Sequence, residues 1–233
     1  MKELKIWLFA IASGLITASI ITGCTQAYAD SIQNEIASNV IRFHVLAHSN
    51  TALDQEIKDI VRDGILDRFG SKLDPTTNSI EDTRTFLLEN LDGIQEYAAV
   101  IVKEHGLGYP VETKMGRVFF PTRTYGSMSF PAGEYEALRI IIGEGSGGNW
   151  WCVMFPPLCY VDAPANGPDT EPDYSGGDYS LLSTLLSREA YALMNHSQRD
   201  TGVTVRFKVV EWWQERMYDP APVFTALNPI PSQ

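Results

Sequence analysis

Residues 149–162 read NWWCVMFPPLCYVD. The adjacent tryptophans offer a large amphipathic surface, the prolines fix the backbone, and Cys152 and Cys159 are close enough to close a small ring. Such a segment is costly to expose to water and has few conformations available. It therefore predicts either a core hairpin or a rigid recognition surface. A catalytic loop is disfavoured, because the thiols are the only strong nucleophiles in the segment.

Strand-like patterning surrounds this stretch. β-branched and apolar residues with a period of two, separated by Gly- and Pro-rich turns, indicate strands. The predicted strands are residues 40–47 (VIRFHVLA), 111–120, 134–142, 150–160 and 203–210.

Helical spacing of apolar residues predicts three helices between these strands. The first begins after the capping residues Ser49, Asn50 and Thr51, with Asp54 in its first turn, and ends at Gly70.

The second begins with a capping box formed by Ser79 and Asp82 and ends at Gly106, and the third covers residues 181–194. The order β-α-α-β-β-β-α-β predicts a single compact α+β domain over residues 38–215, with helices packed on a mixed or antiparallel sheet.

Two segments lack apolar periodicity. Residues 163–178 are rich in Pro, Gly and Asp, which predicts a flexible surface loop. The tail at residues 216–233 contains Pro220, Pro222, Pro229 and Pro231, so we expect it to be disordered.

The N-terminus has the pattern of an export signal. Two lysines precede a run of 17 uncharged, mostly apolar residues at 6–22. Signal peptidase could cut after residue 29, which makes 1–29 a signal peptide. A lipobox ending at Cys24 competes with this site and would make Cys24 the lipidated N-terminus. The run could also stay as an anchor, although it is short for a bilayer core of roughly 30 Å.

The charge balance argues against nucleic acid as a partner. The chain has a net charge of −11, and residues 1–29 hold two Lys and one Glu, so the remainder carries 16 basic and 28 acidic residues, a net charge of −12. Such a domain repels phosphate backbones and anionic lipid headgroups. We therefore expect membrane association only through an N-terminal lipid or an uncleaved signal.

Cys152 and Cys159 are the remaining pair if Cys24 is lipidated or removed. In an oxidising compartment such a pair often forms a disulfide, and the alternative is two buried free thiols. The six residues between them suit a hairpin better than a zinc site.

A Gly-rich motif at residues 143–148 (GEGSGG) satisfies G-x-G-x-x-G directly after a predicted strand. A dinucleotide site requires a helix N-terminus to follow, to hold the pyrophosphate. Here a strand follows, so we expect a hairpin turn with positive φ angles and no nucleotide cofactor.

Candidate catalytic and metal groups are sparse. His44 and His48 flank the exit of a strand with no third ligand evident, so we expect no metal. Glu134 and Glu136 could in principle serve a glycosidase, but at a spacing of two on a strand they more often form a solvated face. No catalytic residues are predicted.

The tryptophan pairs Trp150-Trp151 and Trp212-Trp213 each place neighbours on opposite faces of a strand. We expect one member of each pair in the core. The other either packs under a helix or is exposed, and an exposed tryptophan is a favoured anchor for a protein–protein interface.

Three strings carry a family resemblance: VIRFHVLAHSN with DQEIKDIVRDGIL, the run from FPTRTYGSMSFPAGEYEALRIIIG to NWWCVMFPPLCYVD, and VRFKVVEWW. In this order they resemble the stage II sporulation protein R family of endospore-forming bacteria, over about residues 38–215. The resemblance implies a signalling protein made in the forespore and exported into the space between forespore and mother cell. There it would activate a membrane-embedded aspartic protease, which matures the precursor of a mother-cell sigma factor. The resemblance implies no enzymatic activity.

We therefore hypothesise that a rigid aromatic surface contacts the protease. Its candidate residues are Phe120, Pro121, Tyr125, Phe130, Pro131, Gly133, Tyr135, Trp150, Trp151, Pro156 and Pro157. An exported cell-envelope hydrolase and a structural envelope lipoprotein are the alternative functions.

Overall fold

The computed structural model describes residues 2–70, 72, 79–159, 179–195 and 225–226. The predicted strand at 203–210, the loop at 163–178 and the pair Trp212-Trp213 lie outside these residues. Of the tail at 216–233, only the short strand β7 (Thr225–Ala226) is described.

A mixed sheet forms the centre of the domain, as predicted. Its strands are β1 (Ile41–Leu46), β2 (Val111–Phe120), β5 (Gly133–Ile142), β6 (Asn149–Phe155) and β7, in the order β6-β1-β5-β2-β7. β1 runs parallel to β5, and the other pairings are antiparallel. The strand predicted to reach residue 160, β6, ends before Pro156, which has no N–H to donate to a ladder.

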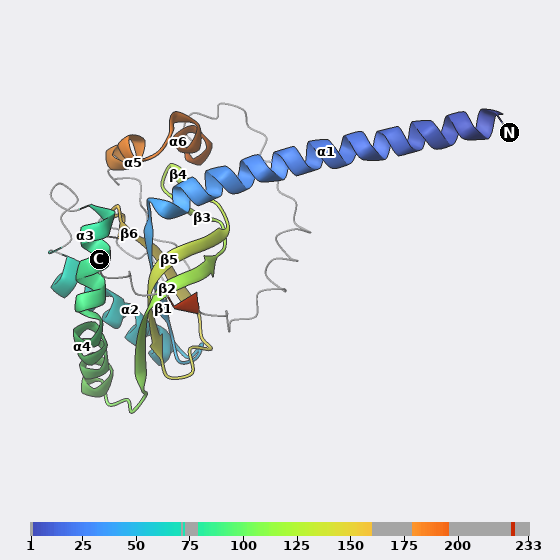
Figure 1. Ribbon diagram of the computed structural model, residues 1–233. Coiled ribbons are helices and arrows are strands. Elements are labelled where there is room, and N and C mark those ends of the chain that lie inside the picture. The colour runs from blue at the N-terminus through green and yellow to red at the C-terminus, as the bar shows by residue number, and fades with distance from the viewer. Residues whose placement is uncertain (1, 71, 73–78, 160–178, 196–224, 227–233) are drawn as a thin grey trace.

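Helices cover the first face of the sheet (Figure 1). They are α2 (Ala52–Ile65), extended by a π-helical turn at Leu66–Gly70, and then α3 (Ile80–Glu89) and α4 (Leu91–Glu104). The predicted caps are confirmed, because the Thr51 hydroxyl accepts a hydrogen bond from the Asp54 N–H, and Ser79 forms a capping box with Asp82. The core on this face includes Phe43, Val45, Ile57, Val61, Ile94, Ala98, Leu138 and Ile140.

Two predicted helices are each divided in the structure. The helix expected from Ser79 to Gly106 breaks at Asn90, whose φ of −103° and ψ of 8° lie outside the helical region, and whose side-chain amide donates to the Phe86 carbonyl at 2.8 Å. The helix expected at residues 181–194 becomes α5 (Ser180–Leu185) and α6 (Arg188–Met194). Here the Ser187 hydroxyl accepts from the Ala190 N–H and starts a new helix.

The described elements cover the second face of the sheet at one end. The end of α1 (Lys2–Ser38), α5, α6 and the ribbon β3 (Arg123–Tyr125) and β4 (Met128–Phe130) gather there (Figure 1). They enclose a second core that includes Ile36, Val118, Phe120, Tyr135, Val153, Leu182 and Met194.

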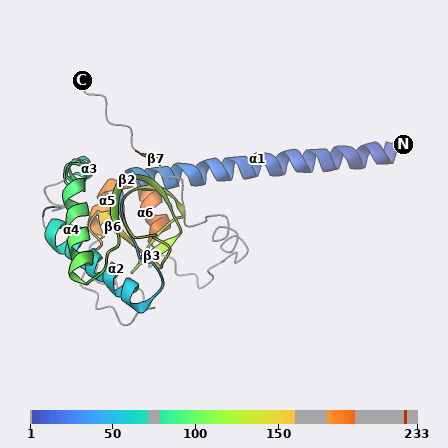
Figure 2. The same cartoon turned by 90° about the horizontal axis from the view of Figure 1, so that it is seen from below.

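Helix α1 joins the apolar N-terminal run to the domain without a break. Most of it projects away from the sheet in both views (Figures 1 and 2), while Ile36 and Ala37 are buried in the second core. The part from Ile6 to Ser38 is long and apolar enough to cross a membrane. This composition and position are consistent with a signal sequence or an anchor, and Cys24 lies exposed on the helix.

The Gly-rich motif forms a turn between β5 and β6 with the predicted positive φ angles, but the turn does not close a hairpin, because β1 lies between these two strands in the sheet. Gly143 and Gly145 have φ angles of +60° and +62°. The Gly147 N–H donates to the Ala47 carbonyl at 3.0 Å, and the Ser146 hydroxyl donates to the His48 carbonyl at 2.7 Å. The turn therefore binds the connection between β1 and α2 through a backbone N–H and the Ser146 hydroxyl.

Candidate partner-binding surface

Four of the predicted surface aromatics are buried. Phe120 and Phe130 are fully enclosed, Tyr135 is also at 0% exposure, and Tyr125 is at 1%. Pro156 is buried as well. These side chains cannot touch a partner in this conformation, because their rings face the inside of the second core. Their role is to support whatever surface lies above them.

The four buried rings surround Arg42, which is itself 0% exposed. The guanidinium carbon lies 4.4 Å from the ring centroid of Phe120, 5.1 Å from Tyr135, 5.2 Å from Phe130 and 5.6 Å from Tyr125. We call Arg42 and these four rings the arginine cage. Each cation–π contact contributes roughly 0.5 to 2 kcal/mol, more when water is excluded, so the rings offset part of the cost of burying the charge.

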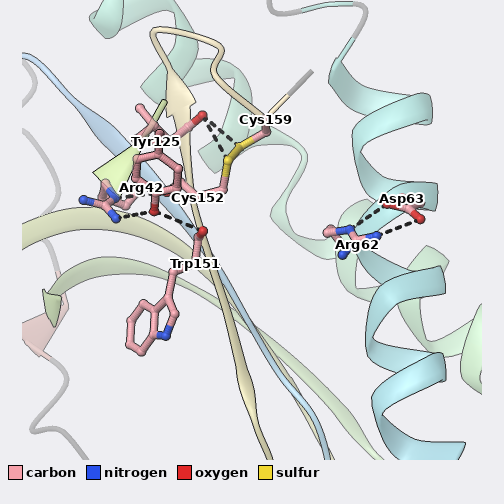
Figure 3. Close-up of a disulfide and its surroundings, with 8 residues drawn as sticks. Arg42, Arg62, Asp63, Tyr125, Trp151, Cys152 and Cys159 are labelled. Carbon is pink, nitrogen blue, oxygen red and sulfur yellow. Dashed lines mark hydrogen bonds and ion pairs between the residues drawn. A yellow bond between two sulfur atoms is a disulfide. The ribbon is translucent and has the colours of Figure 1, made fainter. Parts of the chain in front are cut away.

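Two hydrogen bonds tie Arg42 to neighbouring segments. Its Nε donates to the Cys152 carbonyl at 3.0 Å, and its Nη2 donates to the Tyr125 hydroxyl at 2.8 Å. The Tyr125 hydroxyl donates in turn to the Trp151 carbonyl at 3.0 Å (Figure 3). One buried cation therefore holds β1, the β3–β4 ribbon and β6 together.

Tyr135 fixes the start of β5 against the ribbon. Its hydroxyl donates to the Pro131 carbonyl at 2.7 Å. Burial raises the pKa of Tyr135 to about 12, so the hydroxyl keeps its proton and remains a donor. The backbone around Pro131 is thereby held rigid.

The Cys152–Cys159 disulfide closes the segment that follows β6. The two Cα atoms are 5.9 Å apart, within the usual range for such a bridge. Cys152 is buried and Cys159 is partly exposed, and the ring between them contains Pro156 and Pro157. Figure 3 shows the bridge beside Tyr125 and Arg42. The disulfide and these two residues therefore constrain β6 and the ring that follows it.

The two adjacent tryptophans lie on opposite faces, and both are half-buried. Trp150 packs edge-to-face on Phe43 over the first core, with the Arg62 guanidinium 5.1 Å from its ring. Trp151 stacks on His44 at 3.7 Å on the second face and meets Phe120 at 4.7 Å. The expectation of opposite faces is confirmed, but neither indole is fully in the core. Trp150 and Trp151 therefore face opposite sides of the sheet.

The remaining candidates are partly exposed and border the arginine cage. Pro121 and Pro131 follow the cage residues Phe120 and Phe130, Gly133 lies opposite Phe120 in the ladder, and Pro157 precedes Leu158 of the second core. We define the rim as Pro121, Pro131, Gly133, Trp151 and Pro157. The arrangement is a set of accessible, conformationally restricted residues above a fully packed support.

The two histidines of the strand exit have separate environments. His44 is 2% exposed, and its Nε2 hydrogen-bonds with the Asn149 side-chain oxygen at 3.1 Å. His48 stacks on Tyr109 at 4.0 Å, and its Nδ1 accepts from the Glu144 N–H at 3.1 Å. No group of three or more His, Cys, Asp or Glu side chains suited to a metal occurs within the parts of the chain that the structure describes.

His44 should make stability depend on pH. Its pKa lies well below the ordinary value of 6.5, chiefly because of burial and then because of Arg139, with smaller effects from Arg42 and Arg123; the hydrogen bond with Asn149 opposes them. The folded protein therefore keeps the ring neutral, whereas the unfolded chain takes up a proton below about pH 6.5. Stability is lost as pH falls from about 6.5 toward the folded pKa, at up to about 1.4 kcal/mol per pH unit.

Urea unfolding at pH 7 and pH 5 measures this effect in the wild-type chain and in His44→Phe, which retains an aromatic ring for stacking. Between pH 7 and pH 5 we expect the free energy of unfolding to fall by roughly 1 to 2 kcal/mol more in the wild type than in the variant. Equal losses in both proteins would show that His44 is not the group responsible.

The carboxylate pair expected on a solvated face is divided. Glu134 is exposed, but Glu136 is 9% exposed and pairs with Arg84 of α3, whose Nε lies 2.8 Å from Oε1. The expectation was wrong for Glu136, because α3 covers that part of the strand and supplies a matching cation. This pairing engages Glu136 in a structural contact and not in an open cleft.

Sequence reasoning missed Arg42, which organises the site. A usable signal was present in VIRFHVLA, where Arg42 and His44 alternate with apolar residues and therefore share one face of the strand. A charged and an ionisable residue on a face of an otherwise apolar strand indicate a polar centre inside the fold.

Two comparisons with known proteins match this chain. The family described as Stage II sporulation protein R (spore_II_R) matches residues 37–165. The Stage II sporulation protein R of Bacillus subtilis (strain 168) is 31% identical over 216 residues, which cover 89% of this chain and 94% of that protein. The chain belongs to the stage II sporulation protein R family. No solved structure matches it.

The family match includes all four long strands, the arginine cage and the rim. Stage II sporulation protein R is a family of secreted sporulation proteins, and α1 supplies the apolar N-terminal helix that a signal sequence or an anchor requires.

Proposed function

We propose that this protein is an exported signalling protein of endospore formation that activates a membrane-embedded aspartic protease. The protease would then mature the precursor of a mother-cell sigma factor. Membership in the stage II sporulation protein R family is the observation that carries the proposal. The protein acts in the space between forespore and mother cell, and it makes or breaks no bonds itself.

The rim is the part of the domain that would contact the protease. A ligand can shift a conformational equilibrium only by the difference in its affinity for the two states. A rigid surface loses little conformational entropy on binding. More of its contact energy is therefore available to favour one state of the protease over the other. The arginine cage and the Cys152–Cys159 ring provide this rigidity.

Co-expression of the chain with the protease and the sigma-factor precursor tests the proposal. We expect precursor cleavage only when the wild-type chain is present and exported. An absence of cleavage with correctly exported wild-type chain would contradict the proposal. Labelling of Cys24 with a lipid precursor distinguishes an anchored protein from a processed soluble one in the same cells.

The adjacent tryptophans provide a matched pair for locating the surface. Trp151→Ala removes an indole from the rim, whereas Trp150→Ala removes one of similar burial from the opposite face. A tryptophan at the centre of an interface contributes about 2 kcal/mol or more, so we expect Trp151→Ala to reduce potency by about 30-fold. Trp150→Ala should keep its potency once the amounts of folded protein, measured by circular dichroism, are equalised. Equal potency of the two variants would exclude the second face as the contact surface.

A further inference from the structure

Arg139 is a buried cation in the middle of β5. It is 6% exposed, and within the described parts of the chain its guanidinium makes no hydrogen bond or ion pair; its Nε is enclosed and without a partner. Burial lowers the pKa of Arg139, and the negative charge of Glu112 opposes that change. A buried charge without a partner costs several kcal/mol, so a native protein that retains one requires an explanation.

The sheet register places Arg139 in a row of four side chains across the second face. Lys114 of β2 lies opposite Arg139, Arg139 lies opposite His44 of β1, and His44 lies opposite Trp151 of β6. Directly opposed residues share one face, with Cβ atoms about 5 Å apart. The row therefore runs from a cation at one side to a rim residue at the other.

Two acceptors beside this row, Glu112 and the Asn149 side chain, are engaged with residues other than Arg139. Glu112 pairs with Lys114 at 2.6 Å, and the Asn149 side-chain oxygen pairs with His44 Nε2 at 3.1 Å. The described elements that cover the second face gather at one end of the sheet (Figure 1). The four rings around the neighbouring Arg42 come from β2, β3, β4 and β5. Lys114 and Trp151 are partly exposed, so the two ends of the row reach solvent, while Arg139 and His44 between them are buried.

We propose that Arg139 binds a carboxylate from an acidic side chain of the partner protein, inserted between Lys114 and the indole of Trp151. The planar guanidinium matches a carboxylate with two parallel hydrogen bonds. A protein is the favoured source, because a domain with a net charge of −12 after residue 29 is repelled by anionic lipid surfaces. This inference rests on the proposed function and specifies the chemistry that the partner presents.

Potency in the co-expression assay tests the role of Arg139 in activation. A charge-assisted hydrogen bond contributes about 1.5 to 3 kcal/mol, so Arg139→Gln should reduce potency by about 10-fold to 100-fold. The potency of Arg139→Lys should lie between those of the wild type and Arg139→Gln, because lysine keeps the charge but cannot form the planar bidentate contact. Arg117→Gln is the matched control, since Arg117 lies on β2 with 47% of its side chain exposed, near Glu134. Full potency of Arg139→Gln would overturn the proposal.

A direct binding measurement separates this inference from the proposed function. The full chain, labelled with 15N-arginine in nonionic detergent, is titrated with N-acetylglutamate, inorganic phosphate or vesicles of phosphatidylglycerol. We expect N-acetylglutamate to shift one Nε–H resonance that disappears in Arg139→Lys. A shift with phosphate or vesicles only, or none at all, would overturn the carboxylate assignment. Because this titration uses the wild type, its result does not depend on whether Arg139→Gln folds, and it can succeed even if the protease is not activated.

Discussion

Replacing Arg42 with alanine is expected to lower the free energy of unfolding by about 3 to 5 kcal/mol, because it disrupts the centre of the second core. The variant leaves a cavity between four aromatic rings and removes the donors for the Cys152 carbonyl and the Tyr125 hydroxyl. Denaturant unfolding followed by far-UV circular dichroism measures the change.

Two further variants separate charge from volume at this position. Arg117→Ala removes an exposed arginine from β2 and should change stability by less than about 0.5 kcal/mol. Arg42→Met fills much of the cavity without a charge, and we expect it to recover about half of the loss. If Arg42→Met is as stable as the wild type, the cation contributes nothing to stability, and the arginine cage does not hold the three segments together through its charge.

Replacing Gly147 with alanine is expected to cost about 3 kcal/mol, because the added methyl group meets backbone and not a movable side chain. A Cβ at this position would lie 2.5 Å from the Ser49 carbonyl carbon and still closer to its oxygen. The surrounding segment would have to shift, and the hydrogen bond from the Gly147 N–H to the Ala47 carbonyl would weaken. Thermal and urea unfolding of the variant measure the loss.

Gly93→Ala provides a matched control, because we expect it to raise stability where Gly147→Ala lowers it. Gly93 is exposed in α4, and nothing lies within 4 Å of an added Cβ. Alanine in a helix should therefore stabilise the protein by about 0.5 to 1 kcal/mol. A neutral Gly147→Ala would contradict the close packing of the Gly-rich turn against the connection between β1 and α2.

Local features of the fold could be predicted from the sequence. The alternation of apolar residues located β2 and β5 nearly to the residue, and capping side chains located the starts of α2 and α3. These predictions succeed because a strand period or an N-cap depends on residues within one short segment. The strand that follows the Gly-rich motif could be predicted for the same reason.

Features that depend on distant residues could not be predicted. The parallel pairing of β1 with β5 joins segments about 90 residues apart, and no local pattern encodes it. The short ribbon of β3 and β4 has three residues in each strand, too few for a periodicity. Burial of Phe120, Tyr125, Phe130 and Tyr135 follows from their convergence on Arg42, which only the assembled sheet reveals. The partner-binding role of the rim stays a prediction.

The unbroken course of α1 into the second core determines how far the domain can travel. Ile32, where α1 begins to pack against the domain, lies eight positions after Cys24. At 1.5 Å per residue this part of the helix is roughly 12 Å long, so a lipid at Cys24 would hold the second core close to its own membrane. A protein cut after residue 29 keeps Ile36 and Ala37 and can diffuse to the opposite membrane. Under the proposed function, proteolysis of α1 would therefore determine whether the domain stays at the membrane that anchors it or can reach the other one.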